Sequence, residues 1–289
     1  MRLAPLALAI ATLTVPLAAQ APAPPTEKSL LAEYKDALKS NEPSYRAAAI
    51  SAMSEATREL EDAGASKKVA KALAKGLADE DLEVQAAAIT ALSWGRQPDV
   101  VIDVYEDHIK DLRNEIEKRL TRPDEESVAF KQDASRQYAA VCEALGRHAD
   151  DRSVDVLISQ LRTLTKNSKG KNNLSTILST PLAEALLELG SQEAVEAVVK
   201  QTGVYQGPNQ QQPAKRLHAS LSAFSEGRGW APSDYSFGYD QAWRDWLDEH
   251  EKEFSPKLGK LTEPVGEPAY DPMARYKDAR DGARGGRRP

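Results

Sequence analysis

Few side chains in this 289-residue sequence combine the residue type and spacing that catalysis or metal binding requires. The single cysteine, Cys142, stands at an apolar position of an expected helix, so we predict a buried thiol rather than a nucleophile. The histidines show neither His-Glu-x-x-His spacing nor a pairing with cysteine; they are His108, His148, His218 and His250. No glycine-rich phosphate loop or Gly-x-Ser-x-Gly elbow is present. We therefore expect no catalytic residue, no metal site and no cofactor.

Two acidic clusters have a simpler explanation than cation binding. Asp79 and Asp81, and likewise Asp150 and Asp151, lack the alternating oxygen ligands and the glycine of a calcium loop. Both clusters directly precede apolar-periodic segments. They are therefore interpreted as capping and first-turn residues at helix starts, where carboxylates stabilise unpaired backbone N–H groups.

Aromatic residues gather in one stretch, from Trp230 to Tyr239, among glycines and prolines that break helix formation. This loop allows two interpretations. Its rings either close the end of the fold or form a partner-binding surface, with Trp230, Tyr235 and Tyr239 as candidate contacts. The following segment, 240–254, is predicted to be a closing helix with Trp243, Trp246 and Leu247 on one side.

The charge balance excludes one broad class of partner. The formal net charge is −6, although residues 255–289 alone hold eight Lys or Arg against five Asp or Glu. A broad nucleic-acid surface would need a basic stripe to neutralise phosphates, so we expect no nucleic-acid binding. The basic tail allows another hypothesis, a tether to an anionic envelope surface.

The same helical pattern occurs twice in the first third of the chain. Residues 45–54 (YRAAAISAMS) return 39 residues later as residues 84–93 (VQAAAITALS). A recurrence at this distance is typical of repeat architectures, in which each helix pair buries its apolar face against the next pair. The small residues at the centre of each copy would let neighbouring helices approach closely.

This pattern resembles the second helix of HEAT repeats, which open with Val-Arg, continue with alanines and end in Ala-Leu-Gly. The junction at residues 144–154 (ALGRHADDRSV) is similar to the step between HEAT units. The resemblance covers 28–225 and implies an all-α fold, an α-α superhelix of about five helix pairs with an aromatic capping helix at its C-terminal end. One feature departs from the pattern, because the arginine after the opening residue stands only at Arg46.

The third unit is longer than the others. Residues 102–120 predict a helix of about twenty residues, and a polar loop is expected at 121–131. Polar loops are also expected at 166–173 and 203–213, within the fourth and fifth units.

The N-terminal sequence predicts export, and the C-terminal sequence predicts disorder. Residues 1–19 have the positive start, apolar run and small residues of a signal peptide, and 20–27 form a proline-rich spacer. The alternative is an N-terminal anchor that stays uncleaved. Residues 226–254 hold the aromatic loop and capping helix, and 255–289 are predicted to be disordered.

Together these features favour a non-catalytic scaffold that binds a protein or peptide in the periplasmic or extracellular compartment, without stable membrane insertion after signal cleavage. The resemblance implies binding along the concave face of the second helices. The polar residues expected there are Arg46, Ser51, Gln85, Thr90, Glu143 and Glu184. The alternative is an accessory subunit or a lyase of HEAT-like type with its site on that face.

Overall fold

The computed structural model describes residues 26–59, 67–95, 97–167, 174–205, 211–226 and 239–258. Within these ranges the chain is helical, with no strand beyond an isolated bridge between Ser191 and Ser255. The prediction of an all-α fold is confirmed. The elements are α1 (Glu27–Ala37), α2 (Pro43–Glu59), α3 (Lys67–Leu73), η1 (Ala74–Ala78), α4 (Leu82–Ser93), α5 (Pro98–Arg119), α6 (Glu125–Arg147), α7 (Asp151–Asn167), α8 (Leu174–Leu189), α9 (Gln192–Thr202), α10 (Gln211–Glu226), α11 (Tyr239–His250) and η3 (Glu251–Glu253).

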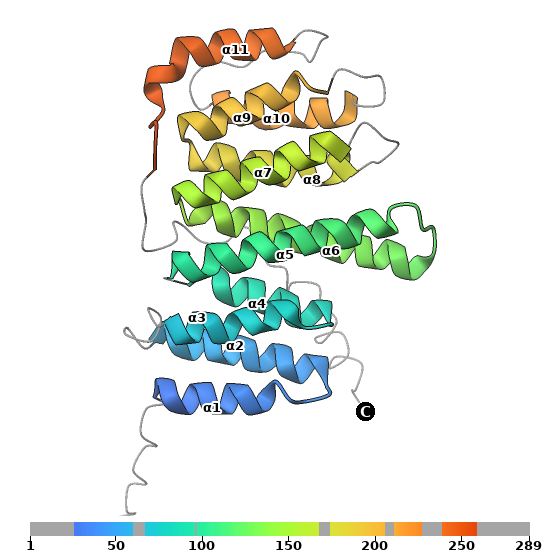
Figure 1. Ribbon diagram of the computed structural model, residues 1–289, viewed down its shortest axis with the longest axis vertical. Helices are drawn as coiled ribbons and strands as arrows, with labels where there is room; N and C mark the ends of the chain where they lie inside the picture. Colours follow the sequence, from blue (N-terminus) through green and yellow to red (C-terminus); the bar gives the residue numbers. More distant parts are fainter. Residues whose placement is uncertain are drawn as a thin grey trace, which may run out of the picture.

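The helices pack in pairs that follow the order of the chain (Figure 1). Each even-numbered helix contacts the next one, so α2, α4, α6, α8 and α10 form one row. The second row contains α3, α5, α7, α9 and α11, and α1 begins the stack beside α2 and α3. Figure 1 shows α1 at one end and α11 at the other.

Small residues determine how closely the even-numbered row packs. In α4 the alanines at 86, 87, 88 and 91 are all buried, together with Val84, Ile89 and Leu92. A Cβ atom at Gly76 of η1 would lie only 2.6 Å from Ile50 Cδ1 and 2.8 Å from Ala88 Cβ. Only glycine permits this approach, because real Cβ atoms do not come so near another carbon.

In the third unit, the loop is shorter than the one expected at 121–131. Residue 125 already begins α6, so the extra residues lengthen both helices of the pair instead of forming a long loop. The reason is an N-cap: Asp124 accepts a hydrogen bond from the Ser127 backbone N–H at 2.7 Å, and two glutamates occupy the first turn. The expected loops at 166–173 and 203–213 are likewise shorter, since α7 extends to 167 and α10 begins at 211.

Helix α11 closes the last pair. Its residues Trp243, Trp246 and Leu247 are buried, with Trp243 fully covered, and α11 packs on α9. The chain then turns back along the side of the stack (Figure 1). Gln192 donates its backbone N–H to Ser255 O at 2.9 Å, and Leu258 donates its backbone N–H to Asp151 Oδ1 at 3.0 Å.

This segment differs from the predicted boundary of a disordered tail at 255, because residues 255–258 make specific contacts with α7 and α9. The rest of that tail, the signal peptide at 1–19 and most of the spacer at 20–27 lie outside the described residues. Within the described part of the chain, none of the helices is both long enough and apolar enough to cross a membrane.

Candidate functional sites

A groove of about 550 Å³ runs across three consecutive even-numbered helices. Its floor is formed by small or apolar side chains: Ala139 from α6, Ile177 and Pro181 from α8, and Ala219 and Ala223 from α10. Polar residues from the same helices complete the lining: Ser135, Arg136, Thr180, Glu184, Arg216 and Ser220. A groove of this volume has the size of typical ligand sites, which span about 300–1,000 Å³.

Pro181 interrupts the backbone hydrogen bonds of α8 beside the groove. Because proline has no N–H, the Ile177 carbonyl lacks the donor that it would meet in a regular helix. Arg216 donates to the neighbouring Thr176 carbonyl from α10. The Thr180 hydroxyl is buried without a hydrogen-bond partner. Acceptor and donor positions therefore lie beside the apolar floor.

The charged groups of the groove are two arginines and one carboxylate. Arg136 and Arg216 are exposed, and they lie on α6 and α10, on either side of α8. Desolvation by burial raises the pKa of Glu184 above its ordinary value. Arg136 also forms an ion pair with Asp133 of its own helix, with 4.0 Å between Nη1 and Oδ1. Arg216 therefore supplies most of the positive charge that an anionic group of an occupant would meet.

A second, smaller pocket of about 330 Å³ lies between the η1–α4 turn and the α5–α6 pair. Its polar lining contains Asp79, Glu80 and Gln85 from the turn and α4, and His108, Asp111, Glu115 and Arg119 from α5. Leu77, Leu82, Leu112 and Phe130 supply apolar wall. The Arg119 guanidinium lies over the Phe130 ring, with 3.6 Å between Cζ and the ring centroid.

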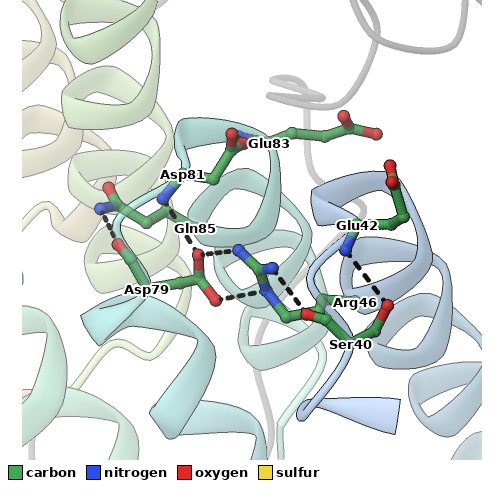
Figure 2. A network of polar contacts seen from close by, with 7 residues as sticks. All are labelled: Ser40, Glu42, Arg46, Asp79, Asp81, Glu83 and Gln85. Carbon is green, nitrogen blue, oxygen red and sulfur yellow. Dashed lines mark hydrogen bonds and ion pairs between the residues drawn. The ribbon is translucent and has the colours of Figure 1, made fainter.

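One wall of this pocket is held by a polar network that joins the first two helix pairs (Figure 2). Arg46 binds Asp79 in a bidentate manner, with Nε 2.8 Å from Oδ2 and Nη2 2.7 Å from Oδ1. The same guanidinium donates to Ser40 O at 2.9 Å. Asp79 Oδ1 also accepts from the Asp81 backbone N–H at 3.0 Å. The pKa of Arg46 is raised, chiefly by its hydrogen bond to Asp79.

Gln85 completes the network and also lines the pocket. Its Nε2 donates to Asp79 O at 2.6 Å, and this contact fixes the amide orientation because a carbonyl cannot donate. Gln85 Oε1 is buried without a hydrogen-bond partner. His108 Nε2 is also buried and unpartnered, and burial lowers the pKa of His108 to about 4. Two of the residues that line the pocket thus each carry a buried polar atom without a hydrogen-bond partner.

The residues predicted for the concave face have different surroundings in the structure. Arg46 and Gln85 are used in the Figure 2 network, whereas Glu184 lines the groove. The hydroxyls of Ser51 and Thr90 donate to the carbonyls of Ala47 and Ala86, four residues back in their own helices. Sequence reasoning missed both the groove and the pocket, because each is formed by residues from several helices.

The acidic clusters act at helix starts, as predicted, but one residue does more. Asp81 is the N-cap of α4 and accepts from the Glu83 backbone N–H at 2.8 Å, and Asp150 accepts from Arg152 N–H at 2.9 Å before α7. Asp79 instead makes the ion pair with Arg46 described above. Its carboxylate therefore links two helix pairs, in addition to ordering the turn.

Buried polar residues also occur at the α6–α7 turn, but they do not form a catalytic relay. His148 and Asp150 each expose 1% of their surface and Ser153 exposes none. Both ring nitrogens of His148 and the Ser153 hydroxyl lack hydrogen-bond partners, so this hydroxyl has no base bound to it. Desolvation and the neighbouring Arg147 lower the pKa of His148 to about 4, while Asp150 acts in the opposite direction.

The remaining predicted site residues are placed as follows. Cys142 is fully buried, as predicted, and desolvation raises its pKa well above the ordinary value. Trp230 and Tyr235 lie outside the described residues, and Tyr239 begins α11, where its side chain is not described.

The two remaining histidines contact tryptophans of α11. His218 accepts a hydrogen bond from Trp243 Nε1 at 3.0 Å. His250 lies on α11 against Trp246, with 5.0 Å between ring centroids.

Across the ranges that the structure describes, no group of three or more His, Cys, Asp or Glu side chains is arranged to hold a metal ion. Comparison of the sequence with known protein families finds no matching family, and comparison with curated proteins finds no match. The groove and the pocket therefore have to be interpreted from their own chemistry.

Proposed function

We propose that this protein is an exported, HEAT-like α-solenoid that serves as a non-catalytic scaffold and binds an extended segment of a partner protein. The single observation that carries the proposal is the groove across α6, α8 and α10. The order of helix contacts supports a superhelical stack, because each pair meets the preceding and following pairs along the chain. The apolar run at 1–19 supports export.

The chemistry of the groove selects the kind of segment. We propose that an extended peptide lies across the three helices. The small residues Ala139, Ala219 and Ala223 leave room for its apolar side chains. Arg136 and Arg216 supply charge-assisted donors for a carboxylate. The proposed occupant is therefore an extended segment that alternates small apolar and acidic residues.

The experiment measures the binding of three fluorescent peptides of one length, acetyl-AVDAVDA-amide and its Asn and Lys analogues, to the full chain. We expect the acidic peptide to bind most tightly, with affinity falling as salt rises. Ala219→Trp fills the groove and should weaken binding at least tenfold. Arg216→Glu should weaken the acidic peptide more than the Asn analogue.

Ala32→Trp on α1 is the matched control, because it adds the same side chain to an exposed alanine distant from the groove. It should leave the affinity unchanged. The proposal fails if none of the three peptides binds, or if the tryptophan on α1 weakens binding as much as the tryptophan in the groove.

A further inference from the structure

The pocket between the η1–α4 turn and the α5–α6 pair is distinct from the groove and has the opposite charge. Four carboxylate residues line it, against one guanidinium, that of Arg119. Asp79 is neutralised by Arg46, and Glu115 has an ion pair with Lys118 at its exposed edge. Glu80 and Asp111 still leave the pocket with an excess of negative charge.

An acidic lining alone does not make a binding site, but the inner wall adds a second feature. Gln85 Oε1 is an acceptor whose orientation is fixed by the Nε2 contact to Asp79 O. His108 exposes only 6% of its surface, and its Nε2 has no hydrogen-bond partner although the residue lines the pocket. Buried polar atoms without partners are costly, and both atoms are acceptors when the His108 ring carries its proton on Nδ1, so a donor that reaches them is favoured.

We propose that this pocket binds an alkylguanidinium group, such as the side chain of an arginine. A guanidinium presents several N–H donors in a planar fork, so it can serve Gln85 Oε1 and His108 Nε2 while its charge faces Asp111 and Glu80. A volume of about 330 Å³ holds one such group with its alkyl stem. Leu82, Leu112 and Phe130 provide the apolar wall against which the stem packs.

Two kinds of molecule carry an alkylguanidinium group: a free alkylguanidine and an arginine within a peptide chain. Calorimetric titration of the full chain uses agmatine for the first and acetyl-Gly-Arg-Gly-amide for the second, with the citrulline analogue of the peptide as the uncharged control. We expect saturable binding of a guanidinium probe and none of the citrulline peptide. Binding of both probes assigns the site to the guanidinium itself, and binding of the peptide alone assigns it to arginine within a chain.

Two substitutions on α5 separate the pocket from general surface charge. Asp111→Asn removes a lining carboxylate from an exposed position and should weaken the guanidinium probe about fivefold or more. Asp107→Asn makes the same charge change one helical turn away, on a side chain that is 85% exposed and outside the pocket. It should leave the affinity unchanged.

The proposal is overturned if neither guanidinium probe saturates the protein, or if D107N weakens binding as much as D111N. It does not depend on the groove across α6, α8 and α10, because the Ala219→Trp variant should bind the guanidinium probes as well as the parent does.

Discussion

The α1–α4 end of the stack and the α9–α11 end hold their neighbouring helices by different interactions. At the first, Arg46 and Asp79 form a bidentate ion pair whose side chains are only 9% and 15% exposed. At the second, Trp243, Trp246, Phe224 and Phe254 pack ring against ring, and the shortest centroid separation among these four is 5.7 Å. The ion pair fixes the geometry of a turn that lines a pocket, whereas the rings mainly remove apolar area from water.

This difference distinguishes a junction between two helix pairs from the last helix of the described stack. Between α2 and α4 both neighbours are present, and small residues such as Ala47, Gly76 and Ala88 already bring the backbones together. A polar link there fixes the orientation of the two helices and buries little additional apolar area. Among the described residues that follow α10, helix α11 carries large rings, and these rings cover apolar surface of the last helix pair.

The largest effect is expected at the aromatic end. Trp243→Ala removes a fully buried indole and should lower the free energy of unfolding by about 3–5 kcal/mol. Trp243→Phe keeps most of the ring but leaves His218 Nδ1 without its donor, and it should cost roughly 1–3 kcal/mol. Urea unfolding followed by circular dichroism measures both. If the alanine variant is as stable as the parent, α11 does not contribute to closing the fold.

At the polar end, Asp79→Asn should cost about 3 kcal/mol, because it leaves the Arg46 guanidinium largely covered and without its counter-charge. The matched variant Asp36→Asn breaks an ion pair between two exposed side chains, Asp36 and Lys39, and should change the stability far less than Asp79→Asn does. A double-mutant cycle with Arg46→Met isolates the pairwise energy. Equal effects of D79N and D36N would contradict the assigned role of the Figure 2 network.

Mild acid should act on two buried histidines in the middle of the stack, His108 on α5 and His148 at the end of α6. Burial lowers the pKa of His108 and of His148 to about 4, whereas an unfolded histidine has a pKa of about 6.5. The unfolded state therefore binds more protons as the pH falls through 6.5, so stability present at pH 7 decreases toward pH 4. At pH 5 each histidine should cost roughly 2 kcal/mol.

The measurement is urea unfolding at pH 7 and pH 5, with His108→Gln as the variant. Replacing His108 should reduce the stability difference between the two pH values by roughly 2 kcal/mol. Helices α1 and α2 contain no histidine, so hydrogen exchange at pH 5 should show an earlier loss of protection in α5 and α6 than in α2. An unchanged pH dependence in the variant would refute the buried, neutral state of His108.

The sequence predicted the helical class because the 39-residue recurrence and alanine-rich stripes are local signals. It also predicted the buried state of Cys142 and of Trp243, Trp246 and Leu247, since three-four spacing defines one face of a helix. Loop lengths in the long third unit were wrong, because Asp124 was not recognised as the N-cap of α6. Capping depends on one side chain and leaves almost no periodic pattern.

The two candidate sites could not be predicted for a different reason. The groove needs residues from α6, α8 and α10, and the pocket combines Gln85 of α4 with His108 and Asp111 of α5. Which of these side chains meet depends on the separation of the helices, and this is determined by contacts such as those of Gly76 and Gly146. Spacing along a single helix carries no information about that separation.

The smallest effect is expected in the segment that follows η3. Residues 255–258 add a hydrogen bond from Gln192 N–H to Ser255 O and another from Leu258 N–H to Asp151 Oδ1, and Leu258 packs against the core. A chain truncated after Phe254 loses these contacts, and a chain truncated after Leu258 retains them. Since each such hydrogen bond contributes about 0.5–1.5 kcal/mol, the shorter chain should be less stable by about 1–3 kcal/mol.

Asp151→Ala in the full-length chain tests the same segment without truncation. It removes the acceptor of the Leu258 N–H and should account for part of the loss seen on truncation after Phe254. Melting temperatures of the three proteins give the comparison, with Asp155→Ala on the exposed side of α7 as the control for a lost carboxylate. If truncation after Phe254 leaves the melting temperature equal to that of the chain ending at Leu258, the returning segment does not stabilise the stack, and the aromatic cluster of α11 closes this end without it.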